Sequence, residues 1–339
     1  MTNELPILRL GFAGFSRQEQ EQLMVLVPSV AVGDVQWEFC EIERADVWLV
    51  DGSRVQVLDD GRIRIGSGIP SGHSIKINLN ELDRPVAFTK QAKLSVPHFT
   101  FEMDSRPSLA AVLHKFEGWL APLIAQCCLA ASIVEHQTAL RSGVFDLRAN
   151  GVRLAVVSMH GETGVSPSLR PSDMDAAVWS RETTDLVIPD NFVRATMSQL
   201  MWQYASRTQR DLLPEHYRTG ALFFRRPPRV QQRQLDDSHL YLLRELSAAP
   251  ATFEALQRRS GMGGRQLSHH LAALYFVGGI TSNPKRAANS PVRSAGADLH
   301  ISSGPASNLP SGLDSVSPDL AQRHGRDADF TAPAPIGLF

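Results

Sequence analysis

Apolar and polar residues follow the periods of strands and helices along the first part of the chain. An apolar run at 7–15 precedes Ser16 and a polar, then apolar segment, which predicts a strand followed by a helix with Ser16 as its N-cap. The segment 35–42 alternates like a half-buried strand, whereas 45–50 is continuously apolar and ends at Asp51. The predicted order is strand, helix, strand, strand.

The region that follows is rich in strand patterns. Alternating runs lie on both sides of Asp60-Gly61, a dipeptide that favours a tight β-hairpin turn. Further strand-like runs follow at 73–79 and 84–89. Residues 5–92 are therefore predicted to form one α/β domain.

The middle of the chain combines helices with a second hairpin. A helix is predicted to begin at Ser105, and Pro122 is expected to break it before a second helix that runs to about Leu140. Asn150-Gly151 lies between two apolar runs and can supply the positive φ angles of a type I′ turn.

An amphipathic helix at 190–213 and a strand at 219–226 complete this region. Together these elements predict a second α/β domain at 93–230. Trp179 and Trp202 are expected to anchor its core.

The C-terminal part changes character twice. Residues 236–284 contain three helix-length amphipathic segments, with a short strand pattern after Gly278-Gly279; the helices are predicted at 236–250, 252–260 and 265–277. From 287 the chain is rich in Ser, Ala, Pro and Gly and has almost no apolar periodicity. Such a composition cannot bury enough surface to offset chain entropy, so 287–339 is predicted to be a disordered tail.

Composition favours an α/β protein of two or three domains. The chain has 339 residues, of which 43% are apolar, and its 34 Lys and Arg nearly balance 35 Asp and Glu. A near-neutral chain has no general attraction for DNA or anionic lipid, so any contact with nucleic acid must come from a local patch.

Three cysteines, Cys40, Cys127 and Cys128, make no disulfide framework, because their number is odd and they form no spaced pairs. The first residues lack the pattern of a secretory signal, and no run reaches the roughly 18 apolar residues that span a bilayer. We therefore expect a cytoplasmic protein without membrane contact.

The segment 236–284 resembles the winged-helix or helix-turn-helix family, with a short second helix, a glycine-containing turn and a longer third helix. In DNA-binding members the third helix lies in the major groove. The resemblance implies that the residues facing bases or phosphates are Arg258, Arg259, Arg265, Gln266, Ser268, His269 and His270. Many winged helices bind proteins instead, so duplex DNA and another regulatory protein are both candidate partners, and a homodimer is compatible with either.

Seven arginines between 207 and 233 meet only two acids, the strongest local charge asymmetry in the chain. The guanidinium group suits phosphates, so Arg225, Arg226 and Arg229 are candidates for binding a nucleic acid or a nucleotide. The alternative is a solvated helix face followed by a linker whose arginines pair with acids elsewhere.

The placement of Asp51 after an apolar strand is similar to the phosphoacceptor strand of response-regulator receiver domains, and Thr89 matches the hydroxyl of that family's switch residue. Lys90 and Lys93 lie near the position of the family's lysine. The acidic pair that holds Mg²⁺ in receivers is missing from the "GFAGFSRQE" segment. Asp51 is therefore a disfavoured candidate for a phosphoacceptor. An aspartate before glycine more commonly serves as a turn residue, and this interpretation is preferred.

No metal or cofactor site is predicted. The neighbours His269 and His270 diverge by about 100° around a helix and cannot share a metal as an i, i+4 pair can. One loop at 160–175 is rich enough in reactive groups for an active site, although a plain connector is the commoner role; it carries His160, Glu162, Ser166, Asp173 and Asp175.

Taken together, the patterns predict a non-catalytic, bacterial-type signalling or transcription-associated regulator with a receiver-like domain, a middle α/β domain and a winged-helix output. The alternatives are an adaptor that binds proteins but not DNA, and a sensor of a nucleotide or phosphate ligand that uses the 207–233 arginines.

Overall fold

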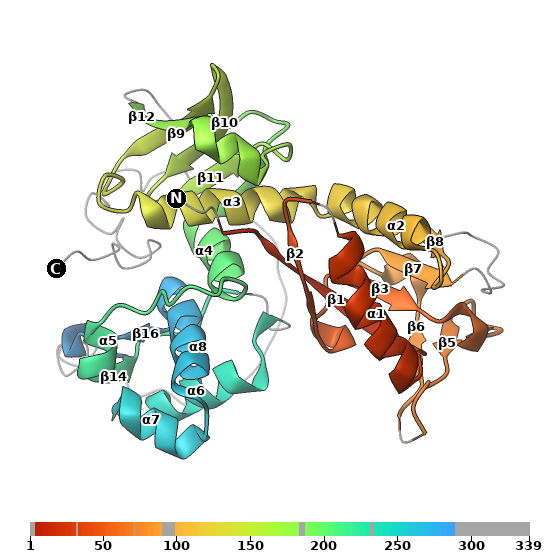
Figure 1. The fold of residues 1–339 in the computed structure, drawn as a ribbon. Coiled ribbons are helices and arrows are strands. Elements are labelled where there is room, and N and C mark those ends of the chain that lie inside the picture. The colour runs from red at the N-terminus through yellow and green to blue at the C-terminus, as the bar shows by residue number, and fades with distance from the viewer. Residues whose placement is uncertain are drawn as a thin grey trace, which may run out of the picture. The chain divides into compact units, whose positions relative to one another are not determined.

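The computed structural model describes residues 4–31, 33–70, 72–89, 99–182, 187–230 and 234–288, which form a mixed α/β fold with several sheets, as predicted (Figure 1). Contacts divide the chain into two compact units. The first contains residues up to 136 together with 144–157 and 163–194, and the second contains 137–143, 158–162 and the chain from 195 onward.

The first unit is built on a five-stranded parallel sheet with the order β2-β1-β3-β7-β8. Its strands are β1 (Ile7–Ala13), β2 (Gln36–Phe39), β3 (Val47–Val50), β7 (Val86–Thr89) and β8 (Phe99–Phe101). Every residue of β3 is buried, as expected for a central parallel strand that is covered on both faces. The order is that of a doubly wound sheet in which ligands bind beyond the carboxyl ends of the first and third strands.

Helices α1 (Arg17–Val30) and α2 (Arg106–Trp119) pack on each other and cover one face of this sheet (Figure 1). The predicted cap of α1 is confirmed: Ser16 Oγ accepts the Glu19 N–H at 3.4 Å, and the Glu19 carboxylate accepts the Ser16 N–H at 2.7 Å. The predicted start of α2 after Ser105 is confirmed as well.

A small antiparallel sheet packs on the other face. The predicted hairpin around Gly61 is confirmed, because β4 (Val55–Val57) pairs with β5 (Ile63–Ile65), and β6 (Ile75–Ile77) joins them. Ile63 and Ile65 are buried against Trp48, Val50 and Phe88 of the parallel sheet. These strands take the place of the helix that a doubly wound fold has between its third and fourth strands.

A second five-stranded sheet has the order β12-β9-β10-β11-β13. The predicted type I′ turn is confirmed, since Asn150 and Gly151 have φ angles of 51° and 80°. Helix α3 (Ala121–Glu135) contacts this sheet through Ser132, whose Oγ accepts the indole N–H of Trp179 at 3.0 Å. The strands are β9 (Val144–Ala149), β10 (Val152–Ser158), β11 (Glu162–Val165), β12 (Ala177–Glu182) and β13 (Val193–Thr196).

Two predicted helices are longer than those observed. The break before Pro122 is confirmed, but α3 ends at Glu135 instead of Leu140. The helix predicted at 190–213 is wrong over most of its length, because β13 occupies its first part and α4 spans only Met197–Ala205. Thr196 ends the strand and caps the helix, with its Oγ1 accepting the N–H of the third helical residue at 3.2 Å.

Among the described residues, the second unit contains α4, α5 (His216–Thr219), α6 (Asp237–Ala248), α7 (Phe253–Ser260) and α8 (Gly264–Phe276). The three predicted helices within 236–284 are therefore confirmed. A three-stranded antiparallel sheet, β15-β14-β16, joins them; its strands are β14 (Ala221–Phe224), β15 (Ala251–Thr252) and β16 (Ile280–Thr281). Short 3₁₀ turns lie at Ile42–Arg44, Gly52–Arg54, Leu79–Glu81, Pro171–Ala176 and Pro284–Arg286.

Sheets extend across the predicted domain limits. The strand β8 lies beyond residue 92 yet pairs with β7, and β14 lies before residue 236 yet pairs with β15 and β16. The first two residues of the predicted tail are also ordered, because Ala287 is buried and the Ala288 N–H donates to Phe224 O at 3.0 Å. Residues 289–339 lie outside the described residues.

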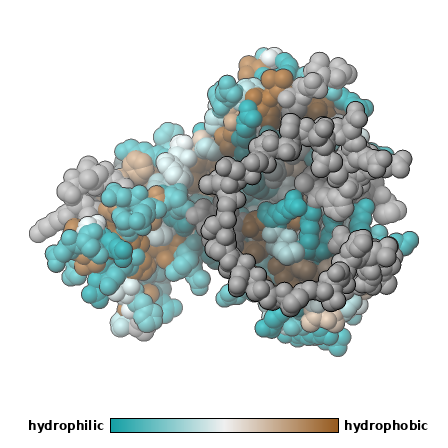
Figure 2. All heavy atoms as spheres, turned by 180° about the vertical axis from the view of Figure 1, so that it is seen from behind, coloured by the Kyte–Doolittle hydropathy of each residue, from teal (hydrophilic) through white to brown (hydrophobic). Residues whose placement is uncertain are grey.

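Hydrophilic residues occupy most of the described surface in Figure 2, with apolar residues in separate patches. The exposed apolar side chains come from different elements, for example Val25 of α1, Val178 of β12 and Leu240 of α6. Among the described residues, no single helix is long and apolar enough to cross a membrane; α2 and α3 meet the length and composition criteria only as a pair, and they are bent by 66° at their junction.

Candidate functional site

Asp51 lies at the carboxyl end of β3, where doubly wound sheets bind ligands. Its buried carboxylate accepts the N–H and the hydroxyl of Ser53 at 3.0 and 2.8 Å and pairs with Arg54 Nε at 3.3 Å. Thr89 lies beside it, with Oγ1 at 3.4 Å from Asp51 Oδ1 and accepting the Gly52 N–H at 2.7 Å. The structure thus brings Asp51 and Thr89 together, but the Asp51 carboxylate already accepts hydrogen bonds from Ser53 and pairs with Arg54 of the loop that follows it.

The loop that contains Gly68 lies against the turn after β1. A Cβ atom at Gly68 would lie 2.1 Å from the carbonyl carbon and oxygen of Phe15, so only glycine allows this approach. The same loop is tied down by Arg54, whose Nη1 donates to Ser67 O at 2.8 Å.

The acidic pair of receiver domains has no equivalent here. The turn after β1 contains Gly14 and Phe15, and a Cβ at Gly14 would lie 3.2 Å from Asp51 Cβ. Lys90 and Lys93 lie outside the described residues. No described carboxylate other than Asp51 comes from these strand ends, so a hard cation would lack the oxygen ligands that it prefers.

The basic residues predicted to face DNA lie around the α7–α8 turn. Arg258 is exposed, and Arg259 is exposed but pairs with Glu245 of α6 at 3.3 Å. Arg265 is exposed on the first turn of α8 and donates from Nη2 to Gln209 O at 2.9 Å. Two of these three arginines therefore already bond protein groups.

Most of α8 is covered by protein, in part by α4, which packs against it. Gln266 is exposed and His269 is partly buried, but the interior positions of the helix are buried: Leu267, Ser268, Leu271, Ala272, Ala273, Leu274, Tyr275 and Phe276. In helix-turn-helix complexes the N-terminal residues of the recognition helix contact the base edges, and the exposed polar side chains of α8, Arg265 and Gln266, lie at that end.

Ser268 belongs to a polar network under the first turn of α8. Its hydroxyl donates to Asp211 Oδ1 at 2.6 Å and accepts from Arg218 Nη2 at 2.7 Å, while Arg218 also pairs with Asp211. Burial by itself would raise the pKa of Asp211, but the hydrogen bonds from Ser268 and the Leu213 N–H, together with the Arg218 charge, hold it below its ordinary value. Ser268 is thus a structural residue rather than a DNA contact.

Of the candidate phosphate-binding arginines, two lie near the end of α8 and one is exposed to solvent. Arg225 and Arg226 approach the C-terminal end of α8, since a Cβ at Gly278 would lie 3.4 Å from Arg225 Nη1 and 3.0 Å from Arg226 Nη2. A positive charge there interacts favourably with the helix dipole, which gives both residues a structural role. Arg229 is exposed, and Arg233 lies outside the described residues.

The 160–175 loop is divided among several local structures. Its residues 162–165 form β11 and Pro171–Ala176 form a 3₁₀ turn. Ser166 is buried and bonds Ser168 Oγ at 2.8 Å, and the Asp173 carboxylate accepts the Arg170 N–H at 2.8 Å. These bonds support the connector role.

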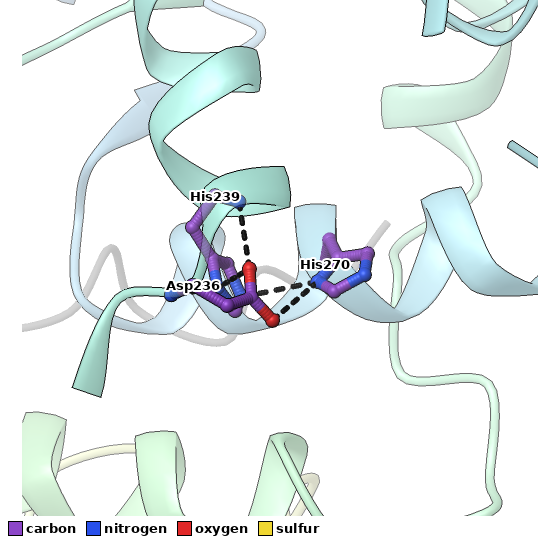
Figure 3. A group of neighbouring side chains, drawn as sticks. All are labelled: Asp236, His239 and His270. Carbon is purple, nitrogen blue, oxygen red and sulfur yellow. Dashed lines mark hydrogen bonds and ion pairs between the residues drawn. The ribbon is translucent and has the colours of Figure 1, made fainter. Parts of the chain in front are cut away.

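Sequence reasoning missed one cluster, formed by Asp236, His239 and His270 (Figure 3). Asp236 caps α6, and its Oδ1 lies 2.7 Å from His239 Nδ1; His239 Nε2 in turn lies 3.3 Å from His270 Nδ1 of α8. Burial by itself would raise the pKa of Asp236, but its bonds to His239 and the nearby imidazoles lower it. His270 thus diverges from His269, as predicted, and meets a different histidine.

The only local signal for this cluster is the i, i+3 spacing of Asp236 and His239, which also fits an ordinary helix cap. Comparison of the chain with family models, with curated proteins and with solved structures gave no match.

Proposed function

We propose that the protein is a non-catalytic regulator whose receiver-like sheet and winged-helix-like module act as protein-binding frameworks, without phosphotransfer and without reading DNA through α8. The bonding of Arg259 and Arg265, around the α7–α8 turn, to protein groups carries this proposal. Of the partners open to such a module, another regulatory protein fits better than duplex DNA. At the first turn of α8, from which a recognition helix contacts bases, Arg265 already donates to the carbonyl of Gln209.

The electrostatics of the module point the same way. Arg259 is neutralised by Glu245, and Arg265 bonds a carbonyl. A DNA-binding face usually concentrates unpaired cations, because each neutralised phosphate adds to affinity through counterion release.

The parallel sheet supports a role without phosphotransfer. Asp51 is surrounded by donors from its own loop, and the position of the metal-binding acids is held by Gly14 and Phe15. We therefore expect no Asp51 phosphorylation when the protein is incubated with Mg²⁺ and a small phosphoryl donor such as acetyl phosphate. Intact-mass detection of a phosphoryl group that disappears in Asp51→Asn would contradict this part.

DNA binding separates the two output roles. Fluorescence anisotropy with labelled duplexes should show no binding at physiological salt. At low salt, the wild type and Arg258→Ala/Arg259→Ala/Arg265→Ala should bind the duplexes equally weakly. Salt-resistant binding that the triple variant loses would refute the proposal.

Cross-linking tests the protein contact directly. A photoreactive residue at position 258, which is exposed on α7, should give cross-linked products of higher mass that nuclease leaves intact. The same residue at position 25, which is exposed on α1, serves as the control for unspecific capture. Nuclease-sensitive products from position 258 alone would point to DNA instead.

A further inference from the structure

The cluster at the start of α6 has the spacing of a metal site. One ligand atom from each of Asp236, His239 and His270 lies within 4.8 Å of the others. The facing nitrogens, His239 Nε2 and His270 Nδ1, are 3.3 Å apart. Two nitrogens bound tetrahedrally to Zn²⁺ at about 2.0–2.1 Å would be ~3.3–3.4 Å apart, so the two imidazoles already match one edge of such a site.

Asp236 adjoins one of these imidazoles. Its Oδ1 caps α6 by accepting the backbone N–H of His239 at 2.9 Å, and the same oxygen lies 2.7 Å from His239 Nδ1. The backbone N–H of Asp236 lies 3.4 Å from this ring nitrogen. These contacts hold the His239 ring with Nε2 facing His270.

The second carboxylate oxygen completes the set. Asp236 Oδ2 lies 3.9 Å from His270 Nδ1, about half an ångström longer than a tetrahedral edge, a gap that a small side-chain rotation closes. The side chains of Asp236 and His270 are 21% and 14% exposed, so solvent can reach the centre of the cluster and fill a fourth position. Without a metal, one of the two facing nitrogens donates a hydrogen bond to the other.

We propose that Asp236, His239 and His270 bind a transition-metal dication, Zn²⁺ by preference, with two imidazole nitrogens and one carboxylate oxygen as protein ligands. Imidazole favours Zn²⁺ over the hard cations Mg²⁺ and Ca²⁺. Because the ligands come from the start of α6 and from α8, the metal links these two helices and stabilises the module. The site is independent of the proposed function.

Zinc uptake by the full chain tests the site. After removal of metals with a chelator, wild type should bind one Zn²⁺ per chain in competition with a chromophoric chelator, and its melting temperature should rise. His270→Gln should lose this zinc, while His269→Gln, which removes the neighbouring imidazole of the same helix, should retain it. The Trp202 ring lies 4.9 Å from that of His239, so Co²⁺ or Cu²⁺ should quench tryptophan fluorescence, less so in Trp202→Phe.

Asp236→Asn keeps the test decisive if His270→Gln fails to fold, because asparagine also caps helices well. This variant should bind zinc ~10-fold more weakly or worse, because a neutral amide oxygen replaces the charged carboxylate ligand. Equal zinc affinity in wild type, Asp236→Asn and His270→Gln would overturn the proposal, and so would the absence of micromolar zinc binding by wild type.

Discussion

Gly68 lies where the loop after β5 crosses the turn after β1, and replacing it tests whether that crossing is as close as the structure has it. In Gly68→Ala the new Cβ would lie 2.1 Å from the carbonyl carbon and oxygen of Phe15 and 2.3 Å from Gly14 O. These are backbone atoms that cannot rotate away, so the loop must open the contact to about 3.4 Å. Such overpacking costs ~1–3 kcal/mol, and the rigid partners place Gly68→Ala in the upper part of that range.

Thermal unfolding followed by circular dichroism measures the effect. A domain of about 150–250 residues loses ~2–4 °C in Tm for each kcal/mol, so ~2–3 kcal/mol should lower the transition that includes the parallel sheet by ~4–12 °C. Gly118→Ala is the matched control: nothing lies within 4 Å of its Cβ position on α2, so alanine should be neutral or stabilise by ~0.5–1 kcal/mol. A Gly68→Ala protein that melts like wild type would refute the close crossing of the two loops.

Three further outcomes follow from individual contacts. Ser16→Ala removes the cap of α1 and should lower the free energy of unfolding by ~1 kcal/mol in urea titration; an unchanged midpoint would contradict the observed capping box. Burial raises the pKa of the Cys40 thiol to about 11, so its labelling by a thiol reagent should be slow at pH 8 and accelerate as the pH approaches that value; fast labelling at pH 8 would show an exposed thiolate. The pKa of Asp236 is lower in the folded protein than the ordinary aspartate pKa of about 4, so its ionised form stabilises the fold above pH 4. This stabilisation is lost as the pH falls from the ordinary pKa through the pKa of the folded state. In the presence of a chelator, Asp236→Asn should therefore be less stable than wild type at pH 7 by ~0.5–1 kcal/mol, and the difference should shrink below pH 4, whereas a constant difference would exclude the charge as its source.

Elements encoded by a few adjacent residues are readable from the sequence. The cap at Ser16, the break before Pro122 and the turn at Asn150-Gly151 each depend on local backbone chemistry, and the structure confirms all three. The strand β8 is too short to show a period, and its pairing with β7 depends on the whole sheet. The prediction of a helix at 190–213 is wrong for a related reason. The helical spacing of apolar residues extends into residues that pair with the second sheet as β13.

The candidate sites were less predictable than the elements, because side chains far apart in the sequence decide them. Asp51 and Thr89 could be placed together from their positions at strand ends, and their 3.4 Å contact agrees with that. In the cluster of Asp236, His239 and His270, the two histidines are 31 residues apart in the sequence, and only the packing of α6 on α8 brings them into contact.

The burial of the second half of α8 can be predicted from its sequence, although the winged-helix resemblance draws attention to its exposed residues instead. Residues 271–276, "LAALYF", are apolar on every side, and a helix with that composition is buried on every side. Ala272 is 2% exposed, so Ala272→Lys would bury a charge and should destabilise the second unit by ~3 kcal/mol or more, whereas Gln266→Lys on the exposed first turn should change stability by less than ~0.5 kcal/mol. If α8 instead presented an open face along its whole length, Ala272→Lys would melt like wild type. Chemical denaturation of this pair of variants therefore shows which part of α8 belongs to the core.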